Sequence, residues 1–228
     1  MEQARQLWQA LLLRGFPIDS WWQSSLLGHL SGSLKNWGQG SLLVQGLDGI
    51  GLGLVLLYWV FSSQSSTGIL GLILLAMAAL VVLSWLVETP TGLPVHLPLG
   101  LFWGIATLAT LLSPVPYAAR DGWLKLTLYL AGYLLLHRLL RQPQFRDGIV
   151  GSLLLVSLGM GIYGLRQYFY GAAELATWVD PESGLAGLTR VYSFLRNPNL
   201  YGGYLVPLLP LGLAAICLWP GWGIKLLV

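Results

Sequence analysis

Long apolar runs separated by short polar segments make up most of the chain after residue 40. A helix needs about 20 predominantly apolar residues to cross a membrane about 30 Å thick. The pattern therefore predicts an all-α, polytopic transmembrane helical bundle of about six spans and a truncated seventh that opens at Lys225. The six runs cover residues 41–61, 68–87, 97–112, 123–140, 149–169 and 200–218, of which the third is short for a span.

The first 40 residues follow a different pattern. Apolar residues recur there at helical spacing, at Trp22, Leu26, Leu30, Leu34 and Trp37. Such a stripe predicts an amphipathic helix that lies in the cytoplasmic membrane interface, and a tail packed on the bundle is the alternative. The predicted organisation is an N-terminal interfacial segment, 1–40, followed by a transmembrane domain, 41–228, that carries a long outer loop at 170–199.

The composition agrees with burial in lipid. Of the 228 residues, 55% are hydrophobic and 9% are charged, whereas a soluble domain has about 25% charged residues. Membrane lipids are therefore the expected partners. No cluster of Lys and Arg of the kind that binds nucleic acid occurs in the sequence. Membership of a larger membrane complex stays open.

Basic residues also predict an orientation, because cytoplasmic loops carry an excess of Lys and Arg. The runs alternate in direction, which assigns six basic residues to the same side as the N-terminus, namely Arg5, Arg14, Lys35, Arg138, Arg141 and Arg146. The other side holds Arg120, Arg190 and Arg196. We therefore expect a plasma (inner) membrane protein with a cytoplasmic N-terminus and a periplasmic loop at 170–199.

The end of that loop carries the candidate chemistry. Arg190 precedes an Arg196-Asn197-Pro198-Asn199 turn, in which proline fixes φ and Asn side chains bond nearby backbone groups. Asn199 is the predicted N-cap of the following span. A guanidinium presents a fork of donors that suits a carboxylate, bicarbonate or phosphate. The predicted anion-binding residues are Arg190, Arg196, Asn197 and Asn199.

Other interpretations of the ionisable residues compete with this one. The two loop arginines could instead pair with Asp180, Glu182 or lipid headgroups. Asp48 lies near the start of the first run, where a solvated helix end competes with a functional intramembrane group. No metal or cofactor is expected, because the sequence has neither metal-ligand spacing nor a nucleotide-binding motif.

The stretch RVYSFLRNPNLYGGYL, residues 190–205, resembles the motif that opens the core region of the O-antigen ligase and polymerase superfamily. Within that superfamily the chain is more closely similar to the cyanobacterial family of inorganic-carbon (bicarbonate) transporters. The similar stretches are residues 24–30, 32–34, 124–130, 163–165, 174–180 and 190–207. This resemblance implies a role in inorganic carbon accumulation, although the predicted spans hold few polar groups for a bicarbonate path.

The wider superfamily implies an alternative activity. Its ligases transfer a glycan from a polyprenyl-diphosphate carrier to an acceptor sugar on the outer face, without a metal. Arg190 corresponds to a functional arginine of that motif, and Asn197 and Asn199 to its Asn-Pro-Asn pair. The ligases need a further arginine and a histidine from a second outer loop outside this chain. The resemblance therefore implies that this chain alone is inactive as a ligase.

Overall fold

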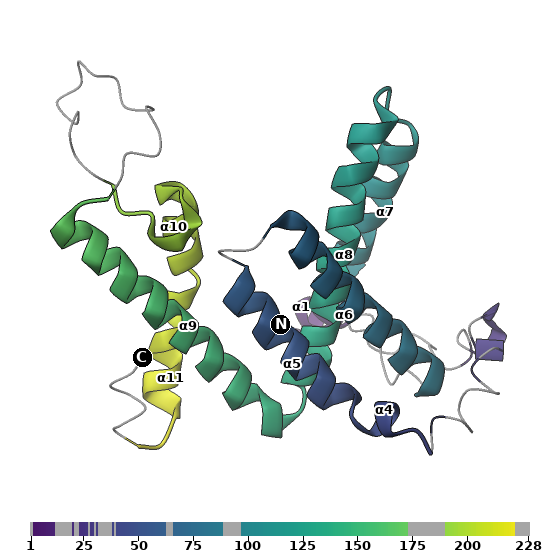
Figure 1. Ribbon diagram of the computed structural model, residues 1–228. Coiled ribbons are helices and arrows are strands. Elements are labelled where there is room, and N and C mark those ends of the chain that lie inside the picture. Colours follow the sequence, from purple (N-terminus) through teal and green to yellow (C-terminus); the bar gives the residue numbers. More distant parts are fainter. Residues whose placement is uncertain are drawn as a thin grey trace. The chain divides into compact units, whose positions relative to one another are not determined.

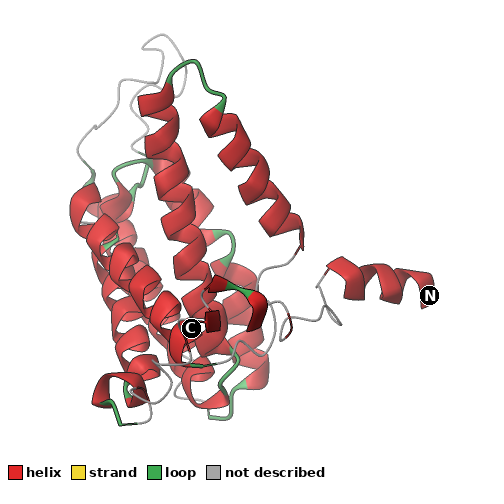
Figure 2. Ribbon diagram, turned by 90° about the vertical axis from the view of Figure 1, so that its right-hand side faces the viewer, coloured by secondary structure: helices red, strands yellow, loops and turns green. Residues whose placement is uncertain are grey.

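The structure is a computed structural model that describes residues 2–11, 20, 23–26, 28–29, 31, 38, 40–62, 66–88, 97–172 and 190–221. Within these residues the regular structure is helical and no strand occurs (Figure 2), which confirms the all-α prediction. The elements are α1 (Glu2–Leu11), α4 (Leu42–Gln45), α5 (Leu47–Phe61), α6 (Thr67–Val87), α7 (Leu97–Leu111), α8 (Pro116–Leu140), α9 (Pro143–Tyr170), the 3₁₀ turn η1 (Ser193–Leu195), α10 (Pro198–Leu205) and α11 (Leu208–Leu218).

Three helical stretches in the described part are long and apolar enough to cross a membrane: α6, α9, and α10 together with α11. Helices α5 and α7 are apolar but have only 15 residues each, about 22 Å at 1.5 Å per residue. Helix α8 has 25 residues and carries charges in its first half, among them Arg120 and Lys125, and Arg138 in its last turn. The count of six spans therefore stays a prediction.

The N-terminal segment is only partly described. Helix α1 places Ala4, Leu7, Trp8 and Leu11 at amphipathic spacing. Of the apolar stripe predicted for residues 22–37, Leu26 alone is described, and it is exposed. The remaining members of that stripe lie outside the described residues, and so does the predicted seventh span at 225–228. The division into an interfacial segment and a membrane domain stays a prediction.

Prolines begin helices in the described part of this chain. The runs at 97–112 and 123–140 predict a non-helical connection over residues 113–122, and this is wrong for residues 116–122. Helix α8 starts on Pro116, with Val115 as its N-cap. Helix α9 similarly starts on Pro143, six residues before the predicted span. Proline suits the first helical position, because the N–H it lacks has no partner there in any case.

Two of the predicted spans are interrupted. The run at 41–61 is divided at Gly46 into α4 and α5. The run at 200–218 is divided at Val206 and Pro207 into α10 and α11. A proline inside a helix removes one N–H donor and crowds the carbonyl four residues before it. Pro207 therefore indicates the second break, although the prediction treats residues 200–218 as one helix.

The chain divides into two compact units: Met1–Tyr58 with Thr67–Phe145, and Trp59–Ser66 with Arg146–Val228. In the first unit α8 packs against α6 and α7 (Figure 1). The buried apolar side chains of this unit come from three helices and are Leu47, Val55, Leu74, Met77, Val81, Leu134, Leu135 and Leu139. A Cβ at Gly132 of α8 would lie 3.2 Å from the Leu74 side chain of α6. A small residue thus lets α6 and α8 approach closely.

A reciprocal pair of Trp–Thr hydrogen bonds joins α7 to α8. The indole Nε1 of Trp103 donates to Thr127 Oγ1 at 3.1 Å, and Nε1 of Trp123 donates to Thr107 Oγ1 at 2.8 Å. Each threonine hydroxyl in turn donates to a carbonyl of its own helix, four residues back. All four side-chain groups are satisfied, so two tryptophans can lie between these helices without an unpaired N–H.

In the second unit α9 runs antiparallel to α10 and α11. Contacts pair Gly164 with Tyr201, Ser157 with Tyr204, and Gly151 with Trp219, so positions rise along one partner as they fall along the other. The buried residues of α9 recur at intervals of three to five and form one face, at Ile149, Leu154, Ser157, Met160, Gly164 and Gln167. This face ends in a buried glutamine beside the candidate site.

Candidate functional site

The predicted site residues belong to a short connection that precedes α10, here called the strap (residues 190–197). It contains η1 and two residues in the left-handed region of φ, Ser193 at 49° and Arg196 at 56°. Side chains other than glycine rarely adopt this conformation, because it crowds Cβ against the backbone. Non-glycine residues persist there only where surrounding contacts hold them.

Those contacts come from α9. The side chain of Gln167 is 5% exposed, and its Oε1 accepts hydrogen bonds from the backbone N–H of Tyr192 at 3.2 Å and of Ser193 at 2.8 Å. Its Nε2 donates a longer bond, 3.4 Å, to the Ser193 carbonyl. Ser193 is 2% exposed, and its Oγ donates to the Met160 carbonyl at 2.7 Å. Polar atoms of α9 thus hold the strap backbone.

Aromatic packing adds to this attachment. The rings of Tyr163 and Phe194 stack with centroids 4.2 Å apart and planes 12° apart. The guanidinium of Arg166 lies over the Tyr163 ring at 5.8 Å, within the range of a cation–π interaction. The strap is therefore fixed both through its backbone and through a stacked side chain.

Asn197 is the N-cap of α10, and our prediction of Asn199 for that role is wrong. The Asn197 Oδ1 accepts from the backbone N–H of Asn199 at 2.9 Å and of Leu200 at 3.3 Å. Proline occupies the first helical position, at Pro198. A proline at that position places the cap on the residue just before it. This shift of the cap by two residues leaves the side chain of Asn199 available for another partner.

That partner is Arg190. Its Nη2 donates to Asn199 Oδ1 at 3.0 Å, so the first strap residue meets the first turn of α10. Arg196 is exposed, and within the described residues it has no ion pair or hydrogen bond through its side chain. The competing acidic partners, Asp180 and Glu182, lie outside the described residues. The structure thus brings Arg190 and Asn199 together and gives Asn197 a capping role.

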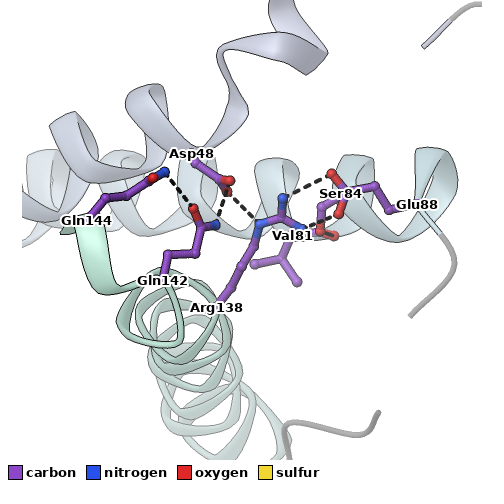
Figure 3. Close-up of polar contacts among 7 residues, drawn as sticks. All are labelled: Asp48, Val81, Ser84, Glu88, Arg138, Gln142 and Gln144. Carbon is purple, nitrogen blue, oxygen red and sulfur yellow. Dashed lines mark hydrogen bonds and ion pairs between the residues drawn. The ribbon is translucent and has the colours of Figure 1, made fainter. Parts of the chain in front are cut away.

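A second polar cluster, which our sequence interpretation did not anticipate, lies in the first unit (Figure 3). Arg138 Nε donates to Asp48 Oδ1 at 2.6 Å. Its Nη1 and Nη2 donate to the two carboxylate oxygens of Glu88 at 2.5 and 3.0 Å. Gln142 Nε2 donates to Asp48 Oδ2 at 2.6 Å. We call these four residues the Arg138 cluster. Asp48 is therefore paired and a quarter exposed at the start of α5, an arrangement that neither of the two competing interpretations of this residue included.

The Arg138 cluster joins three helix ends. Asp48 is in the first turn of α5, Glu88 directly follows α6, and Arg138 is in the last turn of α8. The sequence held a signal for it, because the alternating direction of the runs assigns all three residues to the same side. Two carboxylates surround the Arg138 guanidinium, and each of its three nitrogens donates a hydrogen bond to one of them. The cluster therefore connects helices and does not present a guanidinium to a substrate anion.

The chemistry available at the strap is recognition of a ligand by polar side chains. Within the described part of the chain no three His, Cys, Asp or Glu side chains lie close enough to hold a metal ion. The strap and the first turn of α10 offer two guanidinium groups and two side-chain amides, all exposed.

Compared with protein-family models, curated proteins and solved structures, the chain matches none of them.

Proposed function

We propose that this chain is an integral membrane protein of about six spans that binds an oxyanion at the strap. Its three long apolar stretches suit a membrane. Large apolar side chains on α6, α7 and α11 are exposed, among them Leu72, Leu111 and Leu209. In a membrane, lipid covers such side chains, whereas soluble proteins rarely expose so many large apolar side chains to water.

The topology that we propose has a cytoplasmic N-terminus in the inner membrane. The Arg138 cluster supports alternating spans, because antiparallel neighbours place the start of α5, the end of α6 and the end of α8 on one side. We further propose that α9 crosses the membrane outward, so that the strap faces the outer side, in agreement with the excess of Lys and Arg in the predicted cytoplasmic segments.

One observation carries the proposal of an oxyanion. Asn197 uses its Oδ1 to cap α10, and Asn199 uses its Oδ1 to accept from Arg190. The parts of these side chains that remain for a ligand are their NH₂ groups, which donate. Arg190 and Arg196 add guanidinium donors. Four neighbouring side chains that all offer donors suit a ligand rich in acceptors, such as bicarbonate or phosphate.

The cap of α10 also determines which groups can bind the oxyanion. The N-terminus of a helix commonly binds anions through its free N–H groups. Here Asn197 occupies the N–H groups of Asn199 and Leu200, Pro198 has none, and the Tyr201 N–H bonds to the Asn197 carbonyl. The helix end is therefore already satisfied, and the side chains must provide the binding.

Bicarbonate is the oxyanion that we propose first, with a role in inorganic carbon accumulation, because residues 190–207 resemble the cyanobacterial transporter family. Bicarbonate is planar and small, and a single arginine can bind two of its oxygens in bidentate fashion. The membrane location fits uptake from the outer side.

A second candidate is the diphosphate of a lipid-linked glycan, which the wider superfamily handles. The observation that favours it is a set of exposed apolar side chains in the residues that follow Asn199. Exposed apolar side chains continue from there along α10 and α11, at Leu200, Val206, Leu209 and Leu213. A polyprenyl chain could lie on these side chains while Arg190 holds the diphosphate and stabilises charge on it as a leaving group.

Equilibrium binding tests the proposal. The chain is placed in lipid nanodiscs with labelled bicarbonate in one arm and labelled polyprenyl diphosphate in the other. Arg190→Gln should weaken binding of the true ligand about tenfold or more, since a hydrogen bond to a charged group contributes about 1.5–3 kcal/mol. Arg120→Gln is the matched control, because Arg120 is also exposed and lies on the same predicted side.

The outcomes separate the two ligands. Binding of bicarbonate that depends on Arg190, followed by bicarbonate uptake into proteoliposomes, supports the transport role. Binding of the lipid diphosphate alone supports the glycan-handling role. If neither probe binds, or if both substitutions weaken binding equally, the oxyanion site is rejected.

A further inference from the structure

A buried polar side chain in an apolar helix needs an explanation. Gln167 lies near the end of α9, and its side chain is among the few buried polar groups of the described residues. Burying an amide in an apolar setting without hydrogen bonds costs on the order of 1–3 kcal/mol of folding free energy. Gln167 meets this cost by binding the backbone of Tyr192 and Ser193 with both ends of its amide.

The position of these bonds matters, because Tyr192 and Ser193 stand between Arg190 and the cap of α10. Ser193 has a φ of 49°, so its N–H and carbonyl do not continue a regular strand or helix. Gln167 Oε1 accepts from the backbone N–H groups of both Tyr192 and Ser193, and Ser193 Oγ donates to the Met160 carbonyl. The direction in which the strap leaves Arg190 is therefore set by α9.

Gly164 sets how closely the strap and α10 approach α9. A Cβ at this position would lie 2.8 Å from the Tyr201 hydroxyl and 3.1 Å from Cγ1 of Val191. Val191 follows Arg190, and Tyr201 comes two residues after Asn199. One glycine thus faces both flanks of the Arg190–Asn199 contact. Gly161, one turn earlier on the same helix, has open space around the equivalent Cβ.

We infer that Gln167 and Gly164 are positioning residues, which act through the strap to hold the Arg190 guanidinium against Asn199 in the geometry that binds the anion. The effect on the anion rests on the proposed function, whereas the effect on Arg190 does not. Neither residue touches the ligand surface. Gln167 acts through two backbone N–H groups, and Gly164 acts through the space that it leaves.

The test measures the reactivity of Arg190 first, without any ligand. The chain in nanodiscs is treated with phenylglyoxal, which modifies arginine side chains, and the rate at each arginine is resolved by peptide mass spectrometry. Arg196, exposed and close in sequence, is the internal reference. Four variants are compared with the unsubstituted chain: Gln167→Met, Gln167→Glu, Gly164→Ala and Gly161→Ala. Far-ultraviolet circular dichroism checks that each retains its helices.

We expect Arg190 to react severalfold faster relative to Arg196 in Gln167→Met and in Gly164→Ala, and at the unsubstituted rate in Gly161→Ala. Gln167→Glu keeps an acceptor for the N–H groups of Tyr192 and Ser193, so it should restore most of the protection. A residue with only a general stabilising role would not show this recovery. An unchanged Arg190 rate in Gln167→Met overturns the inference, and so does an equal increase in Gly161→Ala.

The second arm repeats the binding measurement with bicarbonate and with polyprenyl diphosphate. Affinity should fall about tenfold in Gln167→Met, which corresponds to about 1.4 kcal/mol, and about threefold or less in Gln167→Glu. If the unsubstituted chain binds neither probe, the proposed function fails, and the reactivity of Arg190 still decides the positioning role. If Arg190→Gln abolishes binding but Gln167→Met does not change it, the positioning role fails while the proposed function stands.

Discussion

Replacement of Arg138 by Gln should destabilise the first unit more than any other single change of a charged residue in it. The substitution removes three hydrogen bonds and leaves two carboxylates near each other without a cation. Gln142 would remain as a partner of Asp48, but an amide cannot compensate the carboxylate charge. The loss therefore includes a desolvated anion as well as the bonds themselves.

The magnitude follows from the exposure of the partners. The side chains of Arg138 and Asp48 are 27% and 25% exposed, and that of Glu88 is 46% exposed. Breaking a fully buried pair costs about 3–5 kcal/mol, whereas an exposed pair contributes about 0–1 kcal/mol. The Asp48 arm is nearer the first limit and the Glu88 arm nearer the second. We therefore expect a loss of about 2–3 kcal/mol between these limits.

Equilibrium unfolding in mixed micelles with a rising fraction of SDS, followed by tryptophan fluorescence, measures this loss. Arg141→Gln is the control, because Arg141 lies three residues further on, is exposed, and has no ion pair within the described residues. It should change the free energy of unfolding by less than about 0.5 kcal/mol.

A double substitution tests the reason for the loss. If the uncompensated Asp48 carboxylate is the main cost, Asp48→Asn added to Arg138→Gln should recover about 1 kcal/mol, as expected for coupled neighbours. Equal effects of Arg138→Gln and Arg141→Gln would refute the reasoning. The reasoning would also be refuted if the effects of Arg138→Gln and Asp48→Asn on the free energy of unfolding were strictly additive.

Three further predictions concern other contacts. Arg196→Gly should raise the free energy of unfolding by about 0.5–1 kcal/mol, because glycine tolerates the left-handed φ of 56°, while anion affinity falls severalfold; a loss of stability in denaturant titration would contradict this. Asn197→Ala should cost about 1 kcal/mol through loss of the cap, whereas Asn197→Asp should keep the cap but weaken anion binding, which equilibrium binding checks. Trp123→Phe and Thr107→Val should each lower the free energy of unfolding by about 0.6 kcal/mol, and by about 1.7 kcal/mol at most, as the loss of an interhelical hydrogen bond in a membrane does. In SDS unfolding, the double variant should lose little more stability than either single variant.

Helices could be located from the sequence because an apolar run of sufficient length is a local property. The run at 68–87 corresponds to α6 within one residue, and the run at 97–112 corresponds to α7. Boundaries were less accurate where one residue type has two roles. Pro116 can end a helix or begin one, and the outcome depends on whether the preceding residue adopts an extended conformation.

The sequence named the residues of the candidate site but not the contacts among them. The motif pointed to Arg190 and Asn199, which the structure brings within 3.0 Å. The predicted cap, Asn199, lies two residues after the observed one, although Pro198 at the first helical position indicates Asn197. Gln167 was missed because its partners are backbone groups 25 and 26 residues later in the chain. Its visible signal was a polar residue on the apolar face of a long helix.

The break between α10 and α11 has a consequence for the surroundings of this stretch. Pro207 and Pro210 have no N–H, so the carbonyl oxygens of Gly203 and Val206 lack the donors that a continuous helix would supply. Hydrocarbon offers no replacement donor, and each such carbonyl is costly there. In the proposed membrane setting, these two carbonyl groups therefore need a donor from water, from a neighbouring segment or from a local shift of the helical hydrogen bonds.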